Sequence, residues 1–353
     1  MTRTMDYARR IRLFREEVRK HRLDSFLVTN ETNVSYLSGF WGSDAALLVT
    51  AGGKDFFLTD SRYIEEAAEV IKGFVLQVVE KSTYKTIQDL AKARRLKKTG
   101  FESMNLPYEV ASKLKELLPD TRLVPIRGLV EGTRAVKEEA EIKLIKNSIR
   151  LTKEVLKAAL GFVRCGVSEE SLSKRIELEF VKKGAHPAFE PIVASGPDSS
   201  RPHAKAGGRK ISKNSVVMID IGCNLDGYNS DMTRMAFLGR VNDKFKKIYN
   251  IVRKARELAL DMIRPGMRAA KVDTAARGYI EKEGFGAFFG HSLGHGVGMD
   301  VHEEPVISKN SEEVLRTGMV FTVEPAIYIP KFGGVRIEDM ILVTEKGYEV
   351  LTR

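Results

Sequence analysis

A buried strand with one acidic residue inside it sets the first condition on this fold. Residues 215–222 read SVVMIDIG, a β-branched and apolar run that is typical of a buried strand, and Asp220 lies within it. Burying a carboxylate costs free energy unless a charge, hydrogen bonds or a metal ion compensates for the lost water. We therefore expect Asp220 to face a polar site inside an otherwise apolar core.

A hairpin turn is expected to bring a second carboxylate beside the first. The dipeptide Asp226-Gly227 is a strong signal for a two-residue turn. If that turn is central, Asp231 lies opposite Gly222, and Asp231 and Asp220 become diagonal neighbours on one face. Two buried carboxylates repel each other unless a cation or a proton lies between them. On the hairpin alone the alternative stays open, because a one-residue slip would leave Asp231 as an exposed residue.

Three later segments carry the same kinds of side chain. The stretch 290–298 (GHSLGHGVG) contains His291 and His295, and its glycines let the backbone approach a site closely. A strand ends at Glu324, directly before a proline. In VRIED, the alternation of a strand puts Arg336 and Glu338 on one face. Four carboxylates and one imidazole suit a pair of divalent cations such as Mn, Co or Zn: Asp220, Asp231, His295, Glu324 and Glu338.

The histidines are unevenly distributed. Three of the six lie within twelve residues, at His291, His295 and His302, which favours a site over scattered structural roles. The spacing of His291 and His295 is that of a helical zinc pair, but the acidic neighbour is missing and the glycines disfavour a helix. His203 stands alone and, taken by itself, is typical of a surface loop.

The patterns along the 353 residues indicate two domains. Residues 1–130 alternate between the two kinds of element and predict a compact α/β domain with a mixed sheet, with helices at 8–20, 61–71, 85–95 and 108–117 and strands at 25–29, 46–50, 55–59, 75–79 and 122–125. Residues 128–133 are expected to be a linker. Residues 131–353 combine helices with hairpins, which is typical of an α+β domain, with helices at 137–160, 168–183, 245–263 and 269–283 and strands at 215–222, 232–238, 319–323, 326–329 and 335–344.

Composition narrows the setting. The net charge of +11 comes from basic residues spread along the whole sequence, and the densest patch, residues 92–98, is typical of a solvated helix end, so no nucleic-acid partner is expected. Two distant cysteines exclude a disulfide scaffold and indicate a reducing compartment. The charged N-terminal segment is unlike a signal peptide, and no apolar run approaches the length of a membrane span. We therefore expect a cytoplasmic protein without membrane attachment.

Taken together, the motifs resemble those of the pita-bread metallopeptidases, in particular the aminopeptidase P and prolidase branch. The segments DIG, YNSDMTR, GHGVGMDVHEEP, TVEPAIY and VRIED occur in the family's order and spacing. Residues 59–63 (TDSRY) and 134–141 are similar to the family's first domain and domain junction. The resemblance covers essentially the whole chain. It implies a creatinase/prolidase-type N-terminal domain over 1–130 and a pita-bread catalytic domain over 131–353.

The resemblance also implies roles for individual residues. The five donors would be ligands of two divalent metal ions, with Mn expected and Co or Zn as alternatives, and a hydroxide between the ions would attack the scissile carbonyl. Asp231 and Glu338 would bridge the ions, and Glu324 would also carry a proton to the leaving prolyl nitrogen. Further positions match residues near the substrate: His203 and His302 for the peptide and the tetrahedral intermediate, His291 at the edge of the site, Phe189 at the proline pocket, and Arg336 beside the ligands. The family commonly forms homodimers, so a homodimer is expected.

One departure from the family bears on the substrate. Some prolidases carry an arginine shortly after the HExP element, proposed to bind the free carboxylate of a dipeptide, whereas this chain has Val306. The sequence therefore favours an Xaa-Pro aminopeptidase, which acts on peptides with proline in second position, over an Xaa-Pro dipeptidase (prolidase), although Arg201 is a candidate substitute.

Three other functions are less consistent with the sequence. Methionine aminopeptidase is disfavoured by the long first domain and the form YNSDMTR. Creatinase is disfavoured because all five ligand types are present. A non-catalytic pita-bread binding protein is supported only by the positive charge.

Overall fold

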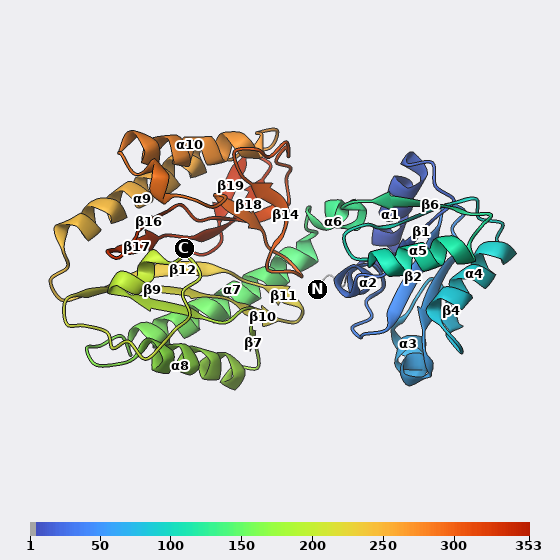
Figure 1. Ribbon diagram of the computed structural model, residues 1–353, viewed down its shortest axis with the longest axis horizontal. Coiled ribbons are helices and arrows are strands. Elements are labelled where there is room, and N and C mark those ends of the chain that lie inside the picture. Colours follow the sequence, from blue (N-terminus) through green and yellow to red (C-terminus); the bar gives the residue numbers. More distant parts are fainter. Residues whose placement is uncertain (1–4) are drawn as a thin grey trace. The chain divides into compact units, whose positions relative to one another are not determined.

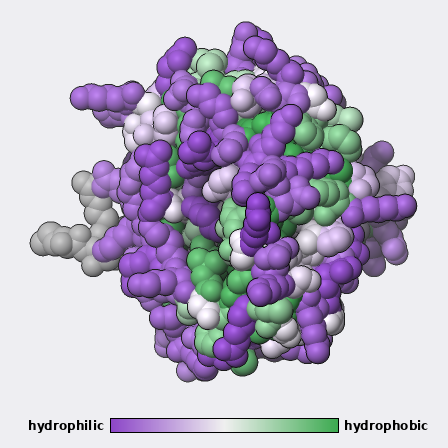
Figure 2. All heavy atoms as spheres, turned by 90° about the vertical axis from the view of Figure 1, so that its left-hand side faces the viewer, coloured by the Kyte–Doolittle hydropathy of each residue, from purple (hydrophilic) through white to green (hydrophobic). Residues whose placement is uncertain are grey.

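The computed structural model describes residues 5–353, which form two compact units that meet in sequence between Arg134 and Ala135 (Figure 1). The first four residues of the N-terminal segment lie outside the described part. No helix among the described residues combines the length and apolar character needed to cross a membrane. Figure 2 shows a face on which hydrophilic side chains cover most of the surface and hydrophobic residues occupy smaller areas between them.

The unit of residues 5–134 is built on one mixed sheet with the strand order β4-β3-β2-β1-β5-β6. The β1–β2 and β2–β3 pairs are antiparallel and the other three pairs are parallel, so the sheet is mixed, as predicted. The strands are β1 Ser25–Val28, β2 Ala45–Thr50, β3 Asp55–Thr59, β4 Phe74–Val78, β5 Lys98–Glu102 and β6 Arg122–Ile126. The helices are α1 Tyr7–Lys20, α2 Glu31–Ser38, α3 Ile64–Val70, α4 Thr83–Ala93, α5 Tyr108–Leu117 and α6 Leu129–Arg134.

Two expectations for this unit need correction. Helix α2 was not predicted, because only its cap, in which the Asn30 side chain accepts from the amide of Asn33, signals it, and most of its residues are buried. The expected linker 128–133 is largely helix α6. Leu129, Val130 and Arg134 of that helix are buried, so tertiary contacts stabilise a segment that has little helical periodicity of its own.

In the unit of residues 135–353, two helix pairs flank the strands (Figure 1). Helices α7 and α8 pack on the sheet β12-β9-β8, and helices α9 and α10 pack on strands of the sheet β14-β13-β15-β18-β19. The helices are α7 Glu139–Leu160, α8 Glu169–Lys182, α9 Asp243–Asp261 and α10 Ala269–Lys282. The strands are β7 His186–Pro187, β8 Ile192–Ser195, β9 Ser215–Ile221, β10 Cys223–Leu225, β11 Tyr228–Asn229, β12 Met232–Leu238, β13 Gly294–Gly296, β14 Glu303–Ile307, β15 Val320–Val323, β16 Ala326–Ile329, β17 Gly333–Arg336, β18 Asp339–Thr344 and β19 Gly347–Val350.

Local signals set the helix ends. Ser168 caps α8 as predicted, since its hydroxyl accepts from the amide of Ser171. A capping box of Glu138 and Glu141 opens α7, and the predicted stripe residues Ile145, Ile149 and Leu156 are buried. Leu160, expected at the end of that stripe, is exposed because the helix ends at this residue.

The predicted strand 335–344 is in fact two strands that belong to different sheets. Strand β17 pairs with β16, and β18 pairs with β15. Ile337 and Glu338 lie at the break between them, and the amide of Ile337 donates to the carbonyl of Pro325 at 3.4 Å. Pro325 separates β15 from β16 at the same point where Ile337 and Glu338 separate β17 from β18, so both segments change sheet there. Glu324, next to Pro325, and Glu338, next to Ile337, therefore lie where the two segments change sheet together. Periodicity alone did not predict this.

Candidate metal centre

The carboxylate hairpin adopts the predicted register. Met232 pairs with Ile221 and Asn229 pairs with Asn224, so the same register puts Asp231 opposite Gly222. Asp220 and Asp231 are only 7% and 5% exposed. One carboxylate oxygen of each, Oδ1, is buried without a hydrogen-bond partner within the described chain. An orphaned buried oxygen is unfavourable in isolation and indicates a missing cation or proton.

The glycine-rich segment forms a strand between two others, which excludes the helical zinc pair. Gly294 pairs with β14 and Gly296 pairs with both β14 and β15. A Cβ atom on Gly294 would lie 1.9 Å from the carbonyl oxygen of Thr322, and one on Gly296 would lie 2.1 Å from that of Glu304. Only glycine permits this approach. The amide of His295 donates to Thr322 Oγ1 at 3.1 Å, which sets the position of the imidazole.

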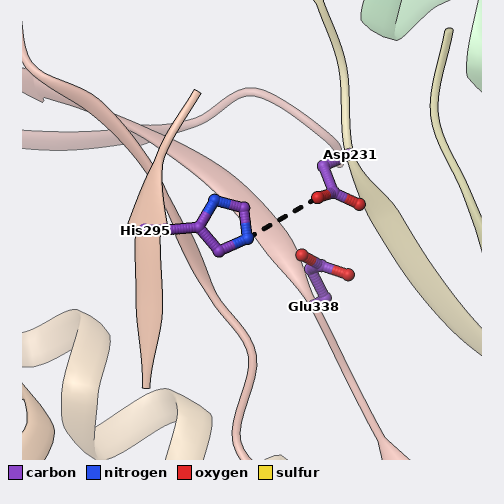
Figure 3. A group of neighbouring side chains, drawn as sticks. All are labelled: Asp231, His295 and Glu338. Atoms are coloured by element: carbon purple, nitrogen blue, oxygen red, sulfur yellow. Dashed lines mark ion pairs between the residues drawn. The ribbon is translucent and has the colours of Figure 1, made fainter. Parts of the chain in front are cut away.

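The donor side chains converge across distant parts of the sequence (Figure 3). Ligand atoms of Asp231, His295 and Glu338 lie within 4.8 Å of one another. His295 Nε2 lies 3.7 Å from Asp231 Oδ2 and 3.3 Å from Glu324 Oε1. Thr322 Oγ1 also donates to Glu324 Oε1, at 3.1 Å.

Arg336 connects the remaining donor to this group. It is 3% exposed and ion-paired with Asp220. Its Nε donates to Thr233 Oγ1 at 2.9 Å, and that hydroxyl donates to Glu338 Oε2 at 2.6 Å. Its Nη1 donates to Tyr328 at 2.7 Å and to the carbonyl of Pro202 at 3.1 Å. The guanidinium is thus a positioning group for two candidate ligands.

Burial and mutual repulsion shift the acidities of the cluster. Burial, followed by the charges of neighbouring carboxylates, raises the pKa of Asp231 and of Glu338 well above their usual range. Burial also raises the pKa of Asp220, although Arg336 opposes it. For Glu324, burial is outweighed by the hydrogen bond and the charge of His295, so its pKa is lowered. Burial likewise opposes the charge on His295, but Glu324 raises its pKa.

These observations fit a divalent cation site. A nearby positive charge beyond that of Arg336 would stabilise the two buried oxygens without partners and would favour ionisation of the three carboxylates whose pKa is raised. The donors are oxygen-rich with one imidazole, the set that suits Mn, Co or Zn. Asp231, His295 and Glu338 already lie close enough to share one ion.

Metal binding is expected to strengthen as the pH rises. In the unfolded chain, carboxylates ionise near pH ~4. In the folded, metal-free protein, those with a raised pKa keep their protons to a higher pH. The free energy of unfolding therefore falls as the pH rises from ~4 to the raised pKa values. A divalent ion must displace those protons. Calorimetric titration of metal-free protein with Mn²⁺ in buffers of different ionisation enthalpy should report proton release, with affinity rising roughly tenfold per pH unit for each proton released. A Mn²⁺ affinity that does not rise with pH, or binding that releases no proton at any pH tested, would contradict a site built on these carboxylates.

The ten side chains that the family resemblance assigns to the site line one cavity of about 510 Å³: Phe189, His203, Asp220, Asp231, His291, His295, His302, Glu324, Arg336 and Glu338. The rings of His295 and His302 have centroids 4.2 Å apart, and burial lowers the pKa of His302. His291 Nδ1 lies 3.9 Å from Glu324 Oε2. The cavity therefore combines the candidate ligands with the predicted substrate-contacting residues.

Several supporting residues were not anticipated. Thr233 and Tyr328 complete the Arg336 network, and their positions inside YNSDMTR and TVEPAIY were the available signal. Arg277 of α10 forms an ion pair at 2.7 Å with the fully buried Asp273 of the same helix. Arg277 donates to the carbonyl of His291 at 2.8 Å, so this pair orients the histidine loop. The spacing of four residues between the opposite charges was the only sequence signal.

Comparison with known proteins agrees with this architecture. Residues 143–345 match the model of metallopeptidase family M24, and residues 10–136 match that of the creatinase/prolidase N-terminal domain. The Xaa-Pro dipeptidase of Pyrococcus horikoshii is 38% identical over 339 residues, covering 95% of this chain and 94% of the relative.

Two solved structures are similar over nearly the whole chain. An Xaa-Pro dipeptidase from Bacillus anthracis has a TM-score of 0.95 and 37% identity, covering 99% of this chain and 98% of that one. An X-Pro aminopeptidase from Thermotoga maritima has a TM-score of 0.86 and 32% identity, covering 96% and 97%. Fold and site thus define a two-part metallopeptidase with a pita-bread catalytic region. The chain belongs to metallopeptidase family M24, which confirms the family and fold class predicted from its motifs.

Proposed function

We propose that this enzyme is an Xaa-Pro dipeptidase. The observation that carries the proposal is the similarity, over nearly the full length of both chains, to Xaa-Pro dipeptidases in sequence and in structure. The sequence favoured an Xaa-Pro aminopeptidase because of Val306, and these relatives support the dipeptidase alternative better. The aminopeptidase stays the second candidate, supported by the similar Thermotoga maritima structure.

The residues that would hold the metal ions are Asp220, Asp231, His295, Glu324 and Glu338, all of which line the cavity. The proposal includes two ions, with Asp231 and Glu338 as the shared ligands. Both belong, with His295, to a group of donors whose ligand atoms lie within 4.8 Å of one another. When bound, divalent ions lower the pKa of water and polarise a carbonyl. Arg336 and Thr233 would keep Asp220 and Glu338 oriented toward them.

Glu324 is the proposed proton carrier. Its lowered pKa keeps it ionised near neutral pH, so it is able to accept a proton from the attacking water. The leaving prolyl nitrogen of an X–Pro tertiary amide carries no hydrogen, so it needs that proton to depart as an amine. His203 and His302 would contact the peptide, His291 would border the site, and the ring of Phe189 would pack against proline.

Peptide length is the direct test. Metal-free protein supplied with Mn, Co or Zn should cleave Xaa-Pro dipeptides with kcat/KM at least about tenfold higher than Xaa-Pro-Yaa tripeptides, since only a dipeptide offers its free carboxylate next to the scissile bond. An Xaa-Ala dipeptide is the matched control for proline. Preference for tripeptides would support the aminopeptidase instead. No X–Pro cleavage with any metal would refute both candidates.

Other features of the proposal rest on the resemblance and on composition. They are manganese as the native metal, a homodimer, a cytoplasmic location and the lack of a nucleic-acid partner.

A further inference from the structure

The charges around the cavity raise the question of how a dipeptide would bind there. Four of the lining carboxylates belong to the candidate metal centre, and Glu190, which is exposed, adds a fifth. A dipeptide places its own carboxylate one residue from the scissile carbonyl. Without a positive group to receive it, that carboxylate would lose its water and approach other negative charges, which is unfavourable.

Most positive groups of the cavity are already engaged. Arg336 uses four N–H groups, on Nε, Nη1 and Nη2, for Thr233, Pro202, Tyr328 and Asp220, and it is buried. Both ring nitrogens of His291 are engaged, Nδ1 with the carbonyl of Ser292 at 2.7 Å and Nε2 with the hydroxyl of Tyr328 at 3.3 Å. Arg201, the candidate substitute cation, pairs with Asp198 in the described chain and is not among the cavity-lining residues.

Lys205 is different. It lines the cavity and is exposed, and within residues 5–353 it has no hydrogen bond or ion pair. Its ammonium carries three donors on a flexible four-carbon stem, which suits the capture of a carboxylate.

The backbone that carries Lys205 is fixed to the site. Pro202, His203 and Ala204 line the same cavity, so the whole segment 202–205 forms part of its wall. The carbonyl of Pro202 accepts from Arg336 Nη1 at 3.1 Å, the amide of Ala204 donates to the carbonyl of Arg201 at 3.2 Å, and Ala204 is buried. Three residues span at most ~11 Å, so the backbone of Lys205 lies within about that distance of Pro202, whose carbonyl contacts Arg336.

An apolar surface accompanies this cation. Phe189, Pro191 and Ile192 line the cavity from the segment before and at the start of β8, and Val301 and Val306 line it from the segment around β14. A Cβ atom on Gly222 would lie 2.9 Å from the Phe189 ring, so that ring packs directly beside the position opposite Asp231. The lining thus offers apolar contacts for a proline ring together with an unpaired ammonium for its carboxylate.

We propose that Lys205 binds the free carboxylate of the C-terminal residue of the substrate and thereby selects for dipeptides. The inference rests on the proposed Xaa-Pro peptidase function and adds a specificity-determining residue to it. Val306, which is 38% exposed on the same cavity, offers no charge, so the selection depends on the lysine.

The test compares substrates that differ only in the terminal charge. For full-length, Mn-loaded protein, the ratio of kcat/KM for Ala-Pro over Ala-Pro-amide should fall about tenfold in Lys205→Met, mostly through KM, and Lys205→Arg should largely restore it. Lys210→Met is the matched control, since it removes the same charge from the same loop outside the cavity lining, and the ratio should stay as in the wild type. An unchanged ratio in Lys205→Met, or an equal fall in Lys210→Met, would overturn the proposal.

A binding measurement separates this proposal from the proposed function. Equilibrium titration with proline and with prolinamide needs no turnover, and the wild type should bind proline about tenfold more tightly than Lys205→Met does, with a smaller difference for prolinamide. If no X–Pro bond is cleaved but this discrimination is present, the proposed function fails and the role of Lys205 stands. If X–Pro bonds are cleaved and the discrimination is absent, Lys205 is not the anchor.

Discussion

Asp231→Asn and Glu338→Gln are each expected to lower metal-dependent turnover at least ~10³-fold while the protein stays folded. Both side chains belong, with His295, to a group whose ligand atoms lie within 4.8 Å of one another. An amide retains the shape of the side chain but supplies no negative charge for a divalent ion. The measurements are kcat/KM on an Xaa-Pro dipeptide and the metal-induced shift in melting temperature, which should nearly vanish.

The stability of the metal-free variants distinguishes the loss of a metal ligand from a general loss of folding. Burial and repulsion raise the pKa of both carboxylates, so above the unfolded pKa of ~4 each one opposes folding in the absence of metal. Each amide variant should therefore melt at the same temperature as metal-free wild type or higher at pH 7. Near-normal turnover in either variant, or a large loss of metal-free stability, would contradict a metal-ligand role.

Lys137→Met is expected to cost about 3–5 kcal/mol of the free energy of unfolding. Lys137 Nζ pairs with Glu303 Oε1 at 2.6 Å, and both side chains are almost fully buried, at 1% and 4% exposure. Removing the cation leaves a desolvated carboxylate with less compensation. Glu303 follows His302 directly and also accepts from the amide of Asp300 at 3.3 Å, so a shift there should also raise KM.

Two controls distinguish burial from charge in general. Lys146→Met removes the partner of Glu349 from an exposed ion pair at 2.8 Å in the same unit and should cost less than about 1 kcal/mol. Lys137→Met combined with Glu303→Met should recover part of the loss, since no lone charge remains buried. Urea denaturation followed by circular dichroism measures all three, and a cost for Lys137→Met as small as for Lys146→Met would refute the argument.

The local patterns were sufficient for much of the fold and for the donor set. Alternation and turn chemistry predicted β9, β12 and their register, because the Asp226-Gly227 turn and the buried face act over a few residues. Apolar periodicity and the Ser168 cap likewise predicted α7 and α8. The resemblance of five motifs then indicated family M24, and the family models match on both sides of the junction.

The sequence patterns failed where distant segments decide the conformation. The strand expected over 335–344 breaks because β17 and β18 pair with partners on either side of Pro325. Helix α6 forms where a linker was expected because its buried residues pack within the first unit, where the helix contacts α1 and α2. The prediction of an Xaa-Pro aminopeptidase relied on Val306 alone. A single position carries no information about other cations in the cavity.

Residue types, turn signals and periodicity were enough to predict a candidate metal site and the hairpin that carries Asp220 and Asp231, because those properties are local. Convergence of the donors required the folded chain. Gly294 approaches the backbone of Thr322, and Arg336 reaches Asp220 across 116 positions of sequence. Contacts of that separation leave no periodic trace, since their free energy comes from packing and charge compensation that exist only after folding. The arrangement of Lys205 beside the apolar lining of the cavity likewise leaves no pattern in the sequence and is seen only in the folded chain.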